Sequence, residues 1–166
     1  MSRSIYVGIP LLVLLLVLQT SALPYLQVGG ITPQLALLAA ISWGLQRGAA
    51  EGMVWAFFAG MMLDAFSFAP QGTTAISLMV AILAVTRLQQ VVPENPVLLP
   101  VLLTGLTFAV YLALSLVVLW LTGHSFSWSN VSQVLPAVVL HGLLGLPASW
   151  LARTLDRMLF PRPIEA

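Results

Sequence analysis

The sequence predicts an all-α, polytopic membrane protein with six transmembrane helices. Hydrophobic residues make up 60% of the 166 residues and charged residues only 7%, and the mean hydropathy is +1.02. This balance is typical of chains that lie in a bilayer. The apolar residues also fall into six runs, separated by glycine, proline and charged residues. At about 20 residues per crossing, these runs fill a single transmembrane domain, residues 1–166, and leave no room for a soluble domain.

The six predicted spans follow these apolar runs closely. We expect them at about residues 5–25, 33–46, 50–65, 73–89, 97–121 and 133–152. The first run could also be a secretory signal, because small residues follow it at positions 20–22. We favour an uncleaved helix, since the run continues to Tyr25 and further spans follow it.

The second and third runs are short for a membrane span. They could instead form a helical hairpin that dips into the bilayer. Two tilted or trimmed spans are favoured because Pro33 suits the first turn of a helix and the turn from Gln46 to Glu51 is polar. Arg47 and Glu51 in this turn are interpreted as a solvated pair of charges.

The arginines orient the predicted spans, because cationic residues in short loops stay on the cytoplasmic side. With the N-terminus inside and six crossings, every arginine falls on the inner side: Arg3, Arg47, Arg87, Arg153, Arg157 and Arg162. A four-span or five-span arrangement would place some of them outside. The sequence therefore predicts a multi-pass protein with both termini in the cytoplasm.

Composition and motifs argue against enzyme chemistry. The chain has no cysteine and no lysine, which excludes thiolate catalysis, disulfides and Schiff bases. No nucleophile elbow, phosphate loop or acid pair is present, and the two histidines lack a carboxylate at ligand spacing. The net charge of +1, without a basic cluster, gives no reason to expect nucleic acid. We predict a protein that is not an enzyme and holds no cofactor and no metal.

The stretch from Gly48 to Gly72 is the most distinctive of the chain. Gly48, Gly52, Ala56 and Gly60 recur at every fourth position, so neighbouring members share one face of a helix. A strip of such small residues lets another backbone approach closely in lipid. The strip leads to Asp64, an acidic residue far from any arginine.

Asp64 falls at the end of the third predicted helix, where the helix dipole disfavours a carboxylate. One interpretation is structural: the side chain caps the turn from Ala65 to Ser67, or accepts hydrogen bonds from Ser67 or from the backbone at Thr73 and Thr74. The alternative is direct contact with a partner or ligand, because carboxylates within membranes are often functional.

The two histidines are candidates for a pocket. His141 lies near the middle of the sixth predicted helix, where an imidazole must form hydrogen bonds. It is either a satisfied neutral histidine between helices or a proton or ligand site. His124 falls in the preceding outer loop, where we expect it to be solvated.

The motif of this central stretch resembles the core signature of the rod shape-determining MreD family. It consists of Phe57, Gly60, Asp64, Ser67 and Gly72, followed by an apolar helix. Length, number of spans and the opening Pro33 are also similar to the family. The chain departs from it at Ala56, where glycine is common, and at Ile82 and Leu83, where an aromatic residue often follows the fourth helix's alanine.

The resemblance implies a place in the bacterial cell-elongation machinery. Members of this family are inner-membrane proteins that associate with MreC, a single-span protein with a large external domain. Through MreC they are connected to the RodA glycosyltransferase and its partner transpeptidase, with MreB filaments on the cytoplasmic face. The family is also similar in fold to the S component of energy-coupling-factor transporters.

Two functional hypotheses follow. In the first, the chain is a non-enzymatic scaffold in membrane lipid that supports peptidoglycan synthesis and cell shape, and its third-helix strip, with Asp64, engages MreC. In the second, it is a small-molecule or lipid-binding carrier subunit of the S-component type, with an outward pocket near Asp64, His124 and His141.

Overall fold

The computed structural model describes residues 2–25, 27–67, 69–92, 95–123 and 133–159, with side chains from residue 5 onward. In these residues the fold is all-helical, and its only strand-like pairing is an isolated bridge between Val28 and Ile31. The described ranges contain six α-helices and one short 3-10 helix: α1 (Ser2–Ser21), η1 (Leu23–Tyr25), α2 (Leu35–Arg47), α3 (Ala49–Ala65), α4 (Thr73–Gln89), α5 (Leu98–Leu121) and α7 (Val134–Leu159).

The all-helical prediction is confirmed, and each predicted span corresponds to one helix. The last helix differs most, because α7 continues to Leu159, seven residues past the expected end of the span at residue 152. Its final turns are held to the bundle, since Leu155 packs against the core and Asp156 forms an ion pair with Arg47. The charged segment after the sixth apolar run is therefore helical.

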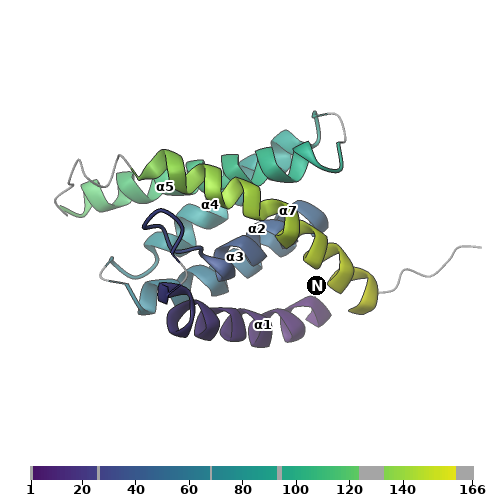
Figure 1. Ribbon diagram of the computed structural model, residues 1–166, viewed down its shortest axis with the longest axis horizontal. Helices are drawn as coiled ribbons and strands as arrows, with labels where there is room; N and C mark the ends of the chain where they lie inside the picture. The colour runs from purple at the N-terminus through teal and green to yellow at the C-terminus, as the bar shows by residue number, and fades with distance from the viewer. Residues whose placement is uncertain (1, 26, 68, 93–94, 124–132, 160–166) are drawn as a thin grey trace, which may run out of the picture.

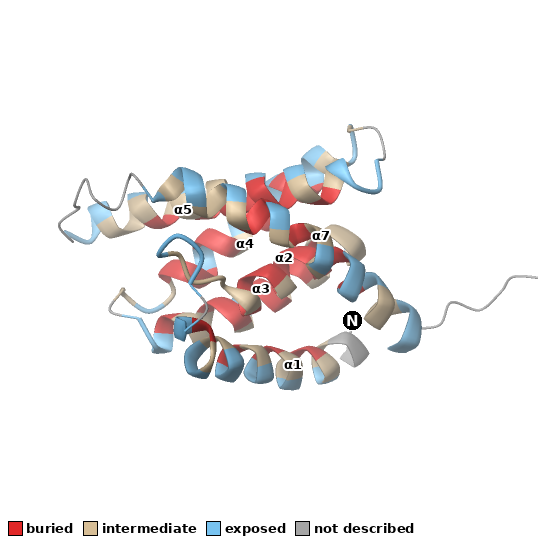
Figure 2. Cartoon of the chain, in the orientation of Figure 1, coloured by how far each residue is buried: buried red, intermediate tan, exposed pale blue. Residues whose placement is uncertain are grey.

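Helix α2 is the centre of the bundle. It contacts α1, α3, α4, α5 and α7, and eight of its 13 residues are buried. At 1.5 Å per residue α2 is about 20 Å long, shorter than the roughly 30 Å hydrocarbon core of a bilayer. A short apolar helix is suited to this place because protein rather than lipid surrounds most of it. Figure 2 shows buried residues concentrated on α2, on α3 and on the sides of neighbouring helices that face them.

The other helices form an incomplete ring around α2. Contacts run from α1 to α3, from α3 to α4, from α4 to α5 and from α5 to α7, but within the described residues none joins α7 back to α1. Figure 1 shows α1 along one side of the molecule and the long pair α5 and α7 along the other, with α2, α3 and α4 between them. The ring is therefore open between α1 and α7.

The outer surfaces of the ring are apolar. Leu14 of α1, Leu102 of α5 and Leu143 of α7 are among many large hydrophobic side chains that are exposed. Within the described residues, α5 and α7 are long and apolar enough to cross a membrane, and Ile5–Ser21 and Thr73–Gln89 are shorter apolar helices. Such a surface suits contact with lipid.

Candidate functional site

The small-residue strip of α3 faces the chain's own helices. A Cβ atom at Gly52 would lie 2.5 Å from the Cα atom of Gly44 on α2, and one at Gly60 would overlap the backbone of Ala75 on α4. Ala56, between them, is completely buried. The predicted close approach is confirmed at Gly52 and Gly60, where the neighbouring helices are α2 and α4. The prediction is wrong for Gly48, which precedes α3 and where an added Cβ atom would meet nothing within 4 Å. The strip is thus filled within the bundle, and its proposed contact with MreC stays a prediction.

The carboxylate of Asp64 is buried and connects the end of α3 to the beginning of α4. Its side chain is 2% exposed. Oδ2 accepts a hydrogen bond from the backbone N–H of Gly72 at 2.8 Å, and both carboxylate oxygens lie 3.1 Å from the N–H of Thr74. These donors belong to the first turn of α4, where the helix dipole favours a negative charge. Asp64 therefore caps α4 from the end of α3, which offsets its unfavourable place on α3 itself.

The structural interpretation of Asp64 is right about Thr74 and wrong about two other donors. Thr73 donates its backbone N–H to the carbonyl of Pro70 instead. Ser67 donates its hydroxyl to the backbone carbonyl of Asp64 at 3.2 Å, not to the carboxylate. Gly72 has a φ of 93°, which favours glycine there and aims its N–H at Asp64.

Among the three motif residues of α3, Phe57 is the one that is exposed. Its side chain is 45% exposed, whereas Gly60 and Asp64 are buried. It lies edge-on to Phe58, with ring centroids 5.6 Å apart. Phe57 is therefore the one motif residue in the buried helix α3 whose side chain reaches the outer surface of the bundle.

His141 is fully satisfied inside the bundle. Its Nε2 accepts a hydrogen bond from the backbone N–H of Gln34 at 3.0 Å, and its Nδ1 lies 2.8 Å from the carbonyl of Ala137. One neutral tautomer, with the proton on Nδ1, serves both contacts. The ring also stacks on Phe108, with centroids 3.8 Å apart. This geometry agrees with the structural interpretation of His141, which ties α7 to the first turn of α2.

The candidate pocket residues Asp64 and His141 do not line the cavity at the outer end of the bundle. A cavity of about 260 Å³ lies near the outer turn, lined by residues that include Gln19, Gln34 and Tyr111, but neither Asp64 nor His141 lines it. His124 lies outside the described residues. The S-component hypothesis therefore gains no support from these side chains.

A cluster at the opposite end of the bundle was not foreseen. Trp43 of α2 stacks on Trp55 of α3, with ring centroids 4.5 Å apart, and donates its indole N–H to Glu51 at 3.2 Å. Arg47 lies over the Trp43 ring and forms an ion pair with Asp156 of α7. The interpretation of Arg47 and Glu51 as merely solvated is wrong. Arg47 and Asp156 are 109 positions apart, and no local pattern connects them.

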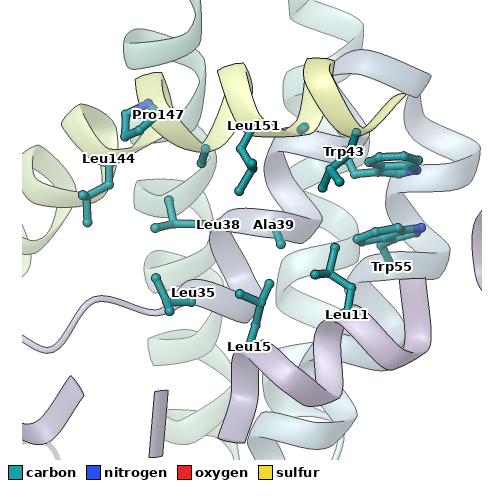
Figure 3. A pocket seen from close by; sticks show the side chains of 13 residues that line it. Leu11, Leu15, Leu35, Leu38, Ala39, Trp43, Trp55, Leu144, Pro147 and Leu151 are labelled. Carbon is teal, nitrogen blue, oxygen red and sulfur yellow. The ribbon is translucent and has the colours of Figure 1, made fainter. Parts of the chain in front are cut away.

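The opening between α1 and α7 forms an apolar cleft of about 240 Å³. Figure 3 shows Leu11 and Leu15 of α1 on one side, Leu144 and Leu151 of α7 on the other, and Ala39 of α2 between them. Trp43 and Trp55 line one end. Among the residues whose side chains the structure describes, no charged one lines this cleft. Its leucines carry no sequence signal that would separate them from leucines facing lipid.

These features define the chain as an α-helical membrane protein, apolar on its outer surface and with its buried motif side chains satisfied inside the bundle. The family model of the rod shape-determining protein MreD matches residues 2–155. The chain therefore belongs to the MreD family, a family of shape-determining membrane proteins. No curated protein and no solved structure matches the chain significantly.

Proposed function

We propose that this chain is a non-enzymatic scaffold of the bacterial cell-elongation complex, which binds MreC in the inner membrane. In this role it supports peptidoglycan synthesis and the maintenance of cell shape. MreC would connect it to RodA, to the elongation transpeptidase and to MreB. Membership of the MreD family supports the proposal.

The proposed topology has six crossings with both termini in the cytoplasm. Arg47, Arg87 and Arg153 line one cavity, so three separate helices place an arginine at the same end of the bundle. Because arginines in short loops stay inside, this end is assigned to the cytoplasm. The short helix α2 crosses within the protein rather than through lipid.

The apolar cleft between α1 and α7 is the proposed binding site for the transmembrane helix of MreC. The observation that carries this assignment is the open ring: α2 contacts five helices, yet Leu35 and Ala39 on it still line a cleft open to the side. A single apolar helix is the simplest element that would complete such a ring. The strip on α3 is a weaker candidate, because Gly52 and Gly60 already meet α2 and α4.

Cysteine crosslinking tests this assignment directly, since the chain contains no cysteine of its own. Leu15→Cys on α1 and Leu151→Cys on α7 would be paired with single cysteines placed along the MreC transmembrane helix. Both positions are expected to form disulfides with MreC, each with a period of about 3.6 residues along that helix. Crosslinked product would be measured on non-reducing gels after mild oxidation of membranes.

Leu102→Cys on α5 is the matched control, because Leu102 is exposed on an apolar surface that does not line the cleft. It is expected to give little crosslinking. Crosslinking from Leu102 in place of Leu15 and Leu151 would move the binding site to another face. Failure of MreC to co-purify with the unmodified chain would reject the scaffold proposal itself.

A further inference from the structure

A polar cavity lies at the arginine-rich end of the bundle. Its volume is about 990 Å³. The ends of α2, α4 and α7 and the beginnings of α3 and α5 surround it. It is separate from the apolar cleft between α1 and α7, with which it shares no lining residue.

The described residues that line this cavity carry a positive charge. They include Arg47, Arg87 and Arg153 and a single carboxylate, that of Asp156, so the formal sum over these described residues is three positive charges and one negative charge, or +2. Asp156 forms its ion pair with Arg47. Arg87 and Arg153 are exposed, and neither forms an ion pair with a carboxylate in the described residues. Two guanidinium groups, from α4 and α7, therefore line this cavity without a carboxylate partner among the described residues.

The walls of the cavity are fixed by contacts between helices. Gln46 donates its side-chain N–H to the carbonyl of Ser149 at 2.7 Å, which joins α2 to α7. Gln89 donates to the carbonyl of Leu45 at 3.1 Å, which joins α4 to α2. Because these amides hold backbone groups in place, the helix ends that carry the two exposed arginines are preorganised around the cavity.

We propose that this cavity binds the phosphate of an anionic phospholipid headgroup. Guanidinium groups bind phosphate oxygens through paired, charge-assisted hydrogen bonds. Basic pockets at the cytoplasmic ends of transmembrane helices are suited to such headgroups. The leaflet follows from the proposed topology, whereas the site itself does not depend on it or on MreC binding.

The surroundings of the cavity favour a lipid over a free anion or an acidic peptide. Large apolar side chains that are exposed flank it on α4 and α5, including Leu88, Val97 and Leu98. Acyl chains would lie along this surface while the phosphate meets Arg87 and Arg153. A soluble anion would gain nothing from these side chains.

Native mass spectrometry of the full chain released from neutral micelles tests the proposal. Phosphatidylglycerol, phosphatidylcholine and inorganic phosphate would be titrated separately. Phosphatidylglycerol is expected to bind with one strong site, and the double variant Arg87→Gln/Arg153→Gln is expected to weaken that site roughly tenfold, the loss typical of a charge-assisted contact. Circular dichroism would confirm that the variant remains helical.

Arg157→Gln is the matched control, because Arg157 is an exposed arginine of α7 that does not line the cavity. It is expected to leave lipid affinity unchanged. If Arg157→Gln weakened lipid binding as much as the double variant does, the loss would follow from the lower net charge of the protein and not from the cavity. Phosphatidylcholine also carries a phosphate but has no net charge, so its equal binding would show that the site does not select an anionic lipid and would overturn the proposal. Equal occupancy by inorganic phosphate would leave a simple anion site. Stronger binding of a glutamate-rich peptide than of phosphatidylglycerol would indicate that the cavity binds an acidic protein segment rather than a lipid.

Discussion

The two sides of helix α2 are built in opposite ways. On one side α3 and α4 approach so closely that Gly44 and Gly52 meet backbone to backbone and Gly60 meets Ala75. On the other side α1 and α7 stay apart and leave an apolar cleft of about 240 Å³. The residues that resemble the family signature belong to the closed side. The open side carries no motif, yet it is the side with room for a partner.

This difference indicates what the motif does. Asp64, Gly72 and Thr74 join the end of α3 to the beginning of α4, and the small residues let the two helices lie close. The closed side therefore fixes the position of α2, and the position of α2 decides the shape of the cleft. In the proposed assignment, the motif would support the partner site without forming it.

Gly60→Leu is expected to have the largest effect, because the added side chain would collide with the backbone of Ala75 rather than with a movable side chain. We expect a loss of about 3 kcal/mol or more in the free energy of unfolding, at the upper end of the range for overpacked cores. Unfolding in mixed micelles by SDS titration measures it.

Phe57→Leu is the control on the same helix, where the side chain is half exposed. It is expected to change the free energy of unfolding by less than about 0.5 kcal/mol. If Gly60→Leu were as stable as Phe57→Leu, α3 and α4 would not be in the close contact described here. If such a stable Gly60→Leu variant still lost MreC binding, the loss would indicate a direct contact of Gly60 with MreC and not a destabilised fold.

Asp64→Ala is expected to have the next largest effect. It would leave the backbone N–H groups of Gly72 and Thr74 buried without an acceptor, at about 1–3 kcal/mol for each group that finds no other partner. Asp64→Asn keeps one oxygen acceptor and is expected to lose about half as much. Amide hydrogen exchange at Thr74 would rise in Asp64→Ala while exchange in α5 stays unchanged. Unaltered exchange at Thr74 would contradict the capping role.

Local features of the fold were predictable because their causes are local. Apolar runs broken by proline and glycine gave the helices, and the four-residue spacing of Gly52, Ala56 and Gly60 gave the close crossing. The acceptor role of Asp64 toward Thr74 followed from its place beside a helix start.

Contacts between distant segments were not predictable. The ion pair of Arg47 with Asp156 and the hydrogen bond from Gln34 to His141 join segments more than 100 positions apart. The first of these contacts lies in the last turns of α7, beyond residue 152, where the apolar run and the predicted span end. The cleft was also missed, because Leu15 and Leu151 have the same chemistry as any leucine that faces lipid.

A matched pair of alanine-to-leucine substitutions, one on each side of α2, compares the closed side with the cleft and has the smallest expected effects. Ala56 is completely buried in the α3 strip, whereas Ala39 is partly buried and lines the cleft. Ala56→Leu is expected to cost about 1–3 kcal/mol in the free energy of unfolding through overpacking. Ala39→Leu is expected to change it by less than about 0.5 kcal/mol, because its side chain extends into open space. The same variant should lower co-purification of MreC, since it fills the space that the partner helix would occupy. The opposite result would contradict this assignment. If Ala39→Leu still bound MreC, and Ala56→Leu was folded and inserted in the membrane but did not bind it, the partner surface would lie on the closed side.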